Sequence, residues 1–350
     1  MNDVVPLPPS TAPIGAADRA VPTYYDQPAV KPSLWGWLVS SYIFIAGIGG
    51  SAQIIATAAD LVGDRALAPV ICNGRYIALG AAVLGGPLLI LDLHTPQRYY
   101  NMLRIFRKTS PMSIGTYVLM SFGSLSAALA ALQFASDRGY SPGRAMQAAI
   151  KLLEVPAAFA GMGMSTYTGA LLSATSNPLW GAAPRHIAAA FGASAMASGT
   201  AALTIADQCR SASGASKEPG SSKEPGRALD RIALVVSAVE FFLLLSLRRR
   251  FHEQGVDGAL NDSGWGPAYD LGAVALGAGL PMLSHTASVI APERAPRLKL
   301  ATCLAILAGG FLLRHVLLRA GNASAERPKD YFRFAGSRTY SVSIPSGNES

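Results

Sequence analysis

Long apolar segments constrain the fold of this chain more than any other feature of its sequence. Eight of them follow residue 33, and each is close to the ~20 residues that a helix needs to cross about 30 Å of hydrocarbon. Barrel strands would instead alternate apolar and polar residues over about ten positions. The sequence therefore predicts an all-α integral membrane protein, with eight transmembrane helices in a bundle of two four-helix halves. The expected spans are approximately 34–59, 70–92, 112–134, 150–175, 185–206, 229–248, 269–290 and 298–319.

The charged residues agree with this class of protein. Only 14% of the chain is Asp, Glu, Lys or Arg, whereas a soluble domain has about 25%. The net charge of +8 fits basic residues beside a membrane, where they set topology and contact anionic headgroups. We therefore expect membrane lipid, and not nucleic acid, as the partner of these charges. Lys and Arg occur in the predicted loops on both sides of the membrane, so the positive-inside rule does not fix the orientation of the protein.

Polar segments flank and interrupt the apolar ones. Residues 1–33 are predicted to form a polar N-terminal tail, 34–319 the membrane domain and 320–350 a polar C-terminal tail. The stretch Lys-Glu-Pro-Gly occurs twice within 207–228 and predicts a flexible loop there. An even number of crossings places both tails on one side of the membrane.

The stretch Asp92-Leu-His-Thr-Pro-Gln-Arg98 lies between the second and third apolar segments. Ionisable groups at membrane depth are costly, so their default interpretation is functional. Asp92 could accept a proton from a quinol hydroxyl while a tyrosine or histidine hydrogen-bonds the opposite oxygen. Asp92 could equally pair with Arg98 or cap a broken helix, and the sequence leaves both interpretations open. The candidate quinone-binding residues are Asp92, Tyr42, His94, Arg98, Ser113 and Tyr117.

Further charged residues fall within the apolar segments, and Asp60, Arg75, Glu154 and Glu240 are candidates for a proton path. The first three should lie at a similar depth on the side opposite Asp92, either as structural ion pairs or as a proton-uptake route. Glu240 lies deep in its segment and could act in a proton relay or form one interhelical hydrogen bond. Arg314 could snorkel to the interface or neutralise a buried carboxylate.

The cysteines and histidines argue against a metal cofactor held by this chain alone. Cys72, Cys209 and Cys303 are far apart and form no C-x-x-C pair, so no iron–sulfur cluster is expected. His285 and His315 should lie roughly 15–20 Å apart along the membrane normal, at 1.5 Å per residue, so they cannot share a haem iron. We therefore expect no intrinsic haem or iron–sulfur cluster.

Several further motifs accompany the stretch 92–98. They are Asn101-Met-Leu-Arg104, Ser110-Pro-Met-Ser-Ile-Gly115, Tyr167-Thr-Gly-Ala-Leu-Leu-Ser173, Pro178-Leu-Trp180 and Gly309-Gly-Phe-Leu-Leu-Arg314, with Ala320-Gly321 beyond. Together these motifs resemble the NrfD/PsrC family of membrane anchors, the polysulfide reductase type, and the resemblance spans roughly residues 34–321. Helix one differs from that of relatives because it carries Tyr42 but no histidine, and His94 stands where relatives often have glycine.

The resemblance implies an eight-helix subunit without a redox cofactor of its own. Such a subunit exchanges electrons between membrane menaquinone or ubiquinone and an extrinsic ferredoxin-like iron–sulfur subunit. That partner relays to a molybdopterin subunit or a multihaem cytochrome. The resemblance makes Asp92 the best candidate quinone or proton ligand. It also implies a multi-pass protein of the bacterial inner membrane with both termini in the periplasm.

Two other functions fit the same composition. Asp60, Glu154, Glu240 and Arg314 would also suit an ion-coupled secondary transporter. Transporters often contain helices interrupted at the midplane, and Pro87 is the nearest candidate for such a break. The third possibility is a purely structural anchor that binds its partner without binding quinone.

Overall fold

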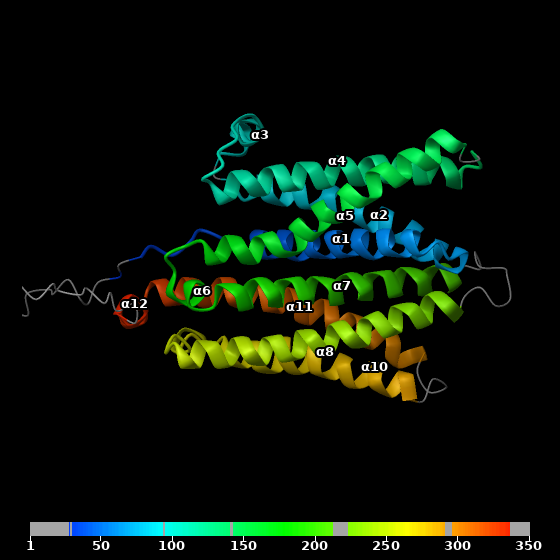
Figure 1. Ribbon diagram of the computed structural model, residues 1–350. Helices are drawn as coiled ribbons and strands as arrows, with labels where there is room; N and C mark the ends of the chain where they lie inside the picture. Colours follow the sequence, from blue (N-terminus) through cyan, green and yellow to red (C-terminus); the bar gives the residue numbers. More distant parts are fainter. Residues whose placement is uncertain are drawn as a thin grey trace, which may run out of the picture.

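The protein is an elongated helical bundle. The computed structural model describes residues 28, 30–93, 95–140, 143–212, 223–290 and 296–336. All regular secondary structure in these ranges is helical, and the long helices run roughly side by side (Figure 1). The prediction of an all-α protein is therefore confirmed for the described part of the chain.

Helices cover each of the predicted apolar segments. Short helices occupy several of the connections: η2 (Arg65–Leu67), η3 (Pro96–Arg98), α3 (Tyr100–Arg104), α6 (Pro178–Ala182) and α9 (Gly258–Asn261). α12 (Pro328–Gly336) follows the last long helix. The long helices are α1 (Trp37–Val62), α2 (Ala68–Leu91), α4 (Pro111–Asp137), α5 (Arg144–Ser173), α7 (Pro184–Ala212), α8 (Lys223–Glu253), η4 (Ala268–Gly279) continued by α10 (Leu280–Ile290), and α11 (Pro296–Ala325).

Five helical segments of the described chain are long and apolar enough to cross a membrane: Trp37–Val62, Arg65–Leu91, Pro111–Asp137, Pro184–Ala212 and Leu298–Ala325. α5 and α8 fall outside this set, and both carry several charged residues along their length. The η4–α10 segment is divided into a π-helix of 12 residues and an α-helix of 11. The chain is thus a helical membrane protein with at least these candidate spans.

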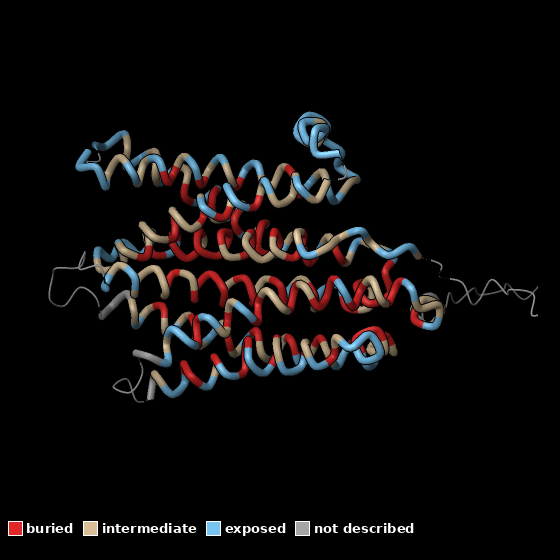
Figure 2. Tube along the Cα trace, turned by 180° about the vertical axis from the view of Figure 1, so that it is seen from behind, coloured by how far each residue is buried: buried red, intermediate tan, exposed pale blue. Residues whose placement is uncertain are grey.

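The buried residues concentrate on the helices at the centre of the bundle. The spans in α1 and α7 are 67% buried, whereas those in α2 and α4 are 28% and 22% buried. Figure 2 shows this as a band of buried residues through the middle of the molecule, with exposed residues on the outer helices. α2 and α4 therefore present most of their apolar surface outward, as lipid-facing helices do.

Both ends of the described chain lie at the same end of the bundle. The backbone N–H of Ser33 donates to the side-chain oxygen of Asn322 at 3.0 Å. α3, α6 and α12 also lie at this end (Figure 1), which we call the α6 end. The C-terminal ends of α7 and α10 lie at the opposite end, which we call the α10 end.

The C-terminal segment is tied to the α6 end by Arg327. Its guanidinium donates to the carboxylate of Asp262 at 2.6 Å and to the carbonyl of Gly258 at 3.1 Å, and it pairs with Asp330 at 3.2 Å. The hydrogen bond to Asp262 raises the pKa of Arg327, and the charges of the two carboxylates add to it. α11 and α12 extend helical structure into the predicted polar tail from residue 320 to 336.

Facing pairs of glycines bring helices into backbone contact at two places. Gly50 of α1 lies against the backbone of Gly161 in α5, and Gly277 of η4 lies against Gly309 of α11. A side chain at any of these positions would overlap the facing backbone, so the close approach depends on glycine.

The predicted loop 207–228 is shorter than expected. α7 continues to Ala212, and α8 begins at Lys223 with the second Lys-Glu-Pro-Gly copy. The first copy lies outside the described residues, as do residues 1–27 and 337–350 of the predicted tails.

Candidate functional site

A narrow cavity lies at the α6 end, between α1, α2, α4 and α5. Its volume is about 80 Å³, and most of its walls are apolar, with leucines from α2 and α5 among them. Its polar side chains come from all four helices: Tyr42, Asp92, Thr116, Tyr167 and Thr168.

Asp92 reaches this cavity from the last turn of α2. Its backbone N–H still donates to the carbonyl of Leu88, at 3.3 Å. The helix ends there, and Pro96 begins η3 a few residues later. The carboxylate is half-buried, at the boundary between the apolar cavity and the connecting segment. A carboxylate in this position can accept a proton from a molecule in the cavity.

Two phenols line the same cavity. Tyr42 of α1 is buried, and Tyr167 of α5 lies close enough to interact with it electrostatically. The hydroxyl of Tyr167 donates to the carbonyl of Pro111 at 2.8 Å. The Tyr167 ring packs directly over Gly115 of α4, where any side chain would overlap it. Gly115 therefore provides the space in which Tyr167 lies.

Ser113 and Tyr117 have a different role in the structure. The Ser113 hydroxyl donates to the carbonyl of Ile105 at 3.2 Å and accepts from the backbone N–H of Arg107 at 3.0 Å. The Tyr117 hydroxyl donates to the carbonyl of Leu103 at 3.1 Å. Both side chains thus hold the segment that includes α3 against the start of α4.

Ser113 also lines a second cavity of about 210 Å³ that adjoins the first. Met102, Met112 and Thr116 line both cavities, so their side chains form the wall between the two. Of the remaining predicted quinone-binding residues, Arg98 is exposed in η3 and His94 lies outside the described residues.

Four residues that line the cavity were not predicted from the sequence to belong to the site: Tyr167, Thr168, Met102 and Met112. All of them lie within the motifs that carry the family resemblance, and that was the available signal. Trp35 lines the cavity as well, and it stacks on Trp180 at a ring-centroid distance of 5.8 Å.

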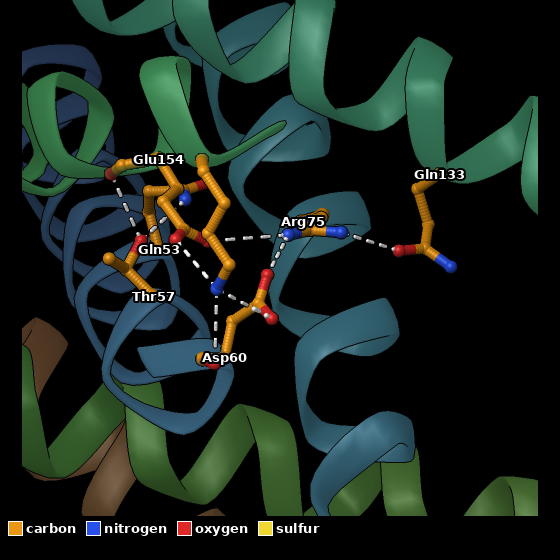
Figure 3. Close-up of polar contacts among 7 residues, drawn as sticks. Gln53, Thr57, Asp60, Arg75, Gln133 and Glu154 are labelled. Carbon is orange, nitrogen blue, oxygen red and sulfur yellow. Dashed lines mark hydrogen bonds and ion pairs between the residues drawn. The ribbon is translucent and has the colours of Figure 1, made fainter. Parts of the chain in front are cut away.

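A charged cluster occupies the α10 end, between α1, α2 and α5 (Figure 3). The buried guanidinium of Arg75 lies 2.6 Å from the carboxylate of Asp60 and 3.7 Å from that of Glu154. It also donates to the side chain of Gln133 at 2.8 Å. Lys151 contacts both carboxylates, at 3.3 and 3.1 Å. The predicted ion pairs are therefore confirmed, while the proton-uptake function of these residues stays a prediction.

Glu240 lies apart from this cluster, in α8. It contacts the hydroxyl of Ser194 in α7 and interacts electrostatically with Arg314 of α11. The Arg314 guanidinium donates to Ser194 at 3.1 Å and to the carbonyl of Gly310 at 2.6 Å. Because Arg314 is only 1% exposed, it does not snorkel to the interface. Its charge instead interacts with the buried carboxylate of Glu240, which agrees with the second of the two roles predicted for Arg314.

Among the described residues, no group of three or more His, Cys, Asp or Glu side chains is placed to hold a metal ion. The chemistry available at the cavity is that of a carboxylate and two phenols on apolar walls.

Most of the chain is similar to known proteins of one family. A family model described as "Polysulphide reductase, NrfD" matches residues 27–325. The C subunit of polysulfide reductase from Wolinella succinogenes is 27% identical over 310 residues, which cover 82% of this chain and 94% of that protein. The family match includes the cavity at the α6 end and both charged clusters.

Proposed function

This chain belongs to the NrfD polysulphide reductase family, and on that premise we propose that it is the quinone-interacting membrane anchor subunit of a respiratory oxidoreductase complex. It passes electrons between the quinone pool of the bacterial inner membrane and an extrinsic ferredoxin-like iron–sulfur subunit. A molybdopterin or multihaem cytochrome subunit completes the complex. The observation that carries this proposal is the cavity in which Asp92, Tyr42 and Tyr167 meet on apolar walls.

The chemistry follows from the oxidation of a quinol, which releases two electrons and two protons. Asp92 accepts a proton from one quinol hydroxyl, while Tyr42 or Tyr167 hydrogen-bonds the opposite oxygen, whose proton leaves to water at the α6 end. The apolar side chains around them suit a hydrophobic ring, as the walls of small-molecule sites generally do. The electrons leave for the iron–sulfur subunit, because this chain is expected to hold no redox centre.

Two adjoining cavities provide the space for the quinone ring. At about 80 Å³ the first cavity is small for a ring, and the second adds about 210 Å³ on the other side of Met102 and Met112. Methionine side chains are unbranched and flexible, so a shift of these two residues would join the cavities. We place the quinone ring where the cavities meet, next to Asp92.

The iron–sulfur subunit docks at the α6 end, next to the cavity, and this end faces the periplasm together with both termini. The segment that includes η3 and α3 supplies exposed cations for that contact. They are Arg98, Arg104, Arg107 and Lys108.

We further propose eight crossings in two halves. α5, α8 and the η4–α10 segment cross the membrane in addition to the five apolar spans. One half (α1, α2, α4 and α5) holds the cavity and the Asp60–Arg75–Glu154 cluster. The other half (α7, α8, η4–α10 and α11) holds Glu240. These four charged residues serve as sites on a proton path coupled to electron transfer.

An ion-coupled transporter remains the alternative, and one observation weighs against it. Pro87, the candidate midplane break, lies inside α2, which is continuous from Ala68 to Leu91. The broken helix that a transporter site uses is therefore missing from this position.

The decisive test is electron delivery from quinol to the iron–sulfur subunit in the reconstituted complex. Asp92→Asn removes the proton acceptor but keeps its size, so we expect delivery to fall at least ~100-fold. Asp64→Asn is the matched control, because Asp64 is exposed at the α10 end and asparagine preserves its hydrogen bond from the Ala66 N–H. Equal rates in Asp92→Asn and wild type would eliminate the role of Asp92 and favour a purely structural anchor.

A further inference from the structure

A third cavity, larger than the two at the α6 end, lies at the α10 end and is separate from the proposed quinone site. It has a volume of about 610 Å³ and is formed by the start of α2, the end of α4 and the start of α5. It shares no lining residue with the two cavities at the α6 end. Any ligand of this cleft would therefore occupy a different site from the quinone.

Cations and amides dominate the polar lining of this cleft. Arg75, Arg144 and Lys151 supply three positive charges, and Gln133 and Gln147 supply side-chain amides. Asp60 lines the cleft too and, with Glu154 behind it, pairs with Arg75 and Lys151. Three cations thus face two carboxylates, which leaves one net positive charge.

The remaining charge belongs to Arg144, the first residue of α5. Its side chain is exposed, and it makes no ion pair with any residue that the structure describes. The amino-terminal end of α5 adds the partial positive charge of its free backbone N–H groups. The cleft is therefore suited to an anion with several acceptor oxygens, such as a phosphate group.

An apolar strip continues from the cleft along the outer surface of α5. Leu152, Val155 and Phe159 are 75%, 39% and 67% exposed, respectively. Their spacing of three, four and seven residues places them on one face of the helix. On a membrane helix such a strip contacts acyl chains. A free inorganic anion would use the cations of the cleft but not the strip.

We propose that this cleft binds an anionic phospholipid. Arg144 and Lys151 contact the headgroup phosphate, and one acyl chain lies along Leu152, Val155 and Phe159. Basic pockets between membrane helices bind anionic headgroups in this way. The ion pairs of Asp60 and Glu154 hold Arg75 and Lys151 in place while the headgroup takes up the charge that remains.

Native mass spectrometry of the full complex, purified in neutral detergent and titrated with phosphatidylglycerol, tests the site. Arg144→Gln removes the unpaired cation and breaks no contact within the described protein. Arg231→Gln is the matched control, because Arg231 is an exposed arginine of α8 at the same end but outside the cleft. We expect Arg144→Gln to weaken phosphatidylglycerol binding about fivefold and Arg231→Gln to leave it unchanged. Equal binding by Arg144→Gln and wild type would overturn the proposal.

A second comparison separates a lipid from a free anion. Phe159→Ser shortens the apolar strip, so it should lower phosphatidylglycerol binding while leaving any effect of inorganic phosphate unchanged. If inorganic phosphate alone raises the melting temperature as much as phosphatidylglycerol does, and Phe159→Ser has no effect on either, the site takes a free anion and the lipid assignment fails.

Discussion

Arg75 is the residue on which the charged cluster at the α10 end depends. It contacts Asp60, Glu154 and Gln133 while itself only 5% exposed. Buried charges seldom add stability as pairs, but removing one partner leaves the other uncompensated, at a cost of about 3–5 kcal/mol. Lys151 also contacts both carboxylates, but it is half-exposed and supplies only one positive charge to the two.

We therefore expect Arg75→Met to destabilise the protein by about 3–5 kcal/mol, measured as a lower midpoint of thermal unfolding in detergent. The double substitution Arg75→Met and Glu154→Leu should recover part of that loss, because it removes the buried carboxylate that Arg75 leaves behind. An unchanged midpoint in Arg75→Met would mean that the cluster is hydrated rather than buried.

Residues of the candidate site show which parts of it the sequence could predict. Asp92 and Tyr42 were predicted to lie together because both fall at the same end of neighbouring apolar segments. The position of Tyr167 depends on how α5 crosses α4 over Gly115, and apolar periodicity contains no information on that crossing. Ser113 and Tyr117 were also predicted to belong to this site, and their hydroxyls bind carbonyls of the connection before α4, whose path the sequence pattern does not define.

At the scale of helices, segment length predicted where helices occur but not their type or exact ends. The 269–290 segment begins as a π-helix, and α5 begins at Arg144, several residues before the expected start. A prediction from hydrophobicity finds only the part of a helix that lies inside the membrane. The helical turns outside the membrane contain charged residues, such as Arg144, and are therefore left out of the predicted span.

The contact between η4 and α11 gives a prediction at this scale. Gly277 and Gly309 bring the two backbones together, so Gly309→Leu must push the helices apart and is expected to cost about 1–3 kcal/mol of stability. Gly80→Leu in α2 is the matched control, because no atom lies within 4 Å of the position that a Cβ would take there. Thermal unfolding of the two variants side by side gives the answer. Equal midpoints would show that the glycine contact is not tight.

At the scale of the whole molecule, the proposed quinone cavity and the charged cluster around Arg75 lie at opposite ends of the bundle. Tyr42 and Asp60 both lie on α1, 18 positions apart, which at 1.5 Å per residue is about 27 Å. Polar side chains occupy the helix between them: Ser51 contacts Ser165 of α5 at 3.3 Å, and Gln53 donates to Thr57 at 3.1 Å. A proton that moves between the cavity and the charged cluster would have to follow this interior face of α1.

The orientation of the whole molecule can be tested with its own cysteines. Cys209 is exposed near the α10 end, Cys72 is half-buried in α2 near the same end, and Cys303 is buried. If the α6 end faces the periplasm, a membrane-impermeant maleimide added to spheroplasts should leave Cys209 unlabelled in a Cys72→Ser background and label it in inverted vesicles. With both Cys72 and Cys209 replaced by serine, Thr109→Cys on the exposed connection before α4 should show the reverse pattern. Labelling of Cys209 from outside would invert the proposed topology. It would move the quinone cavity and its iron–sulfur partner to the cytoplasmic side, and the lipid cleft to the outer leaflet.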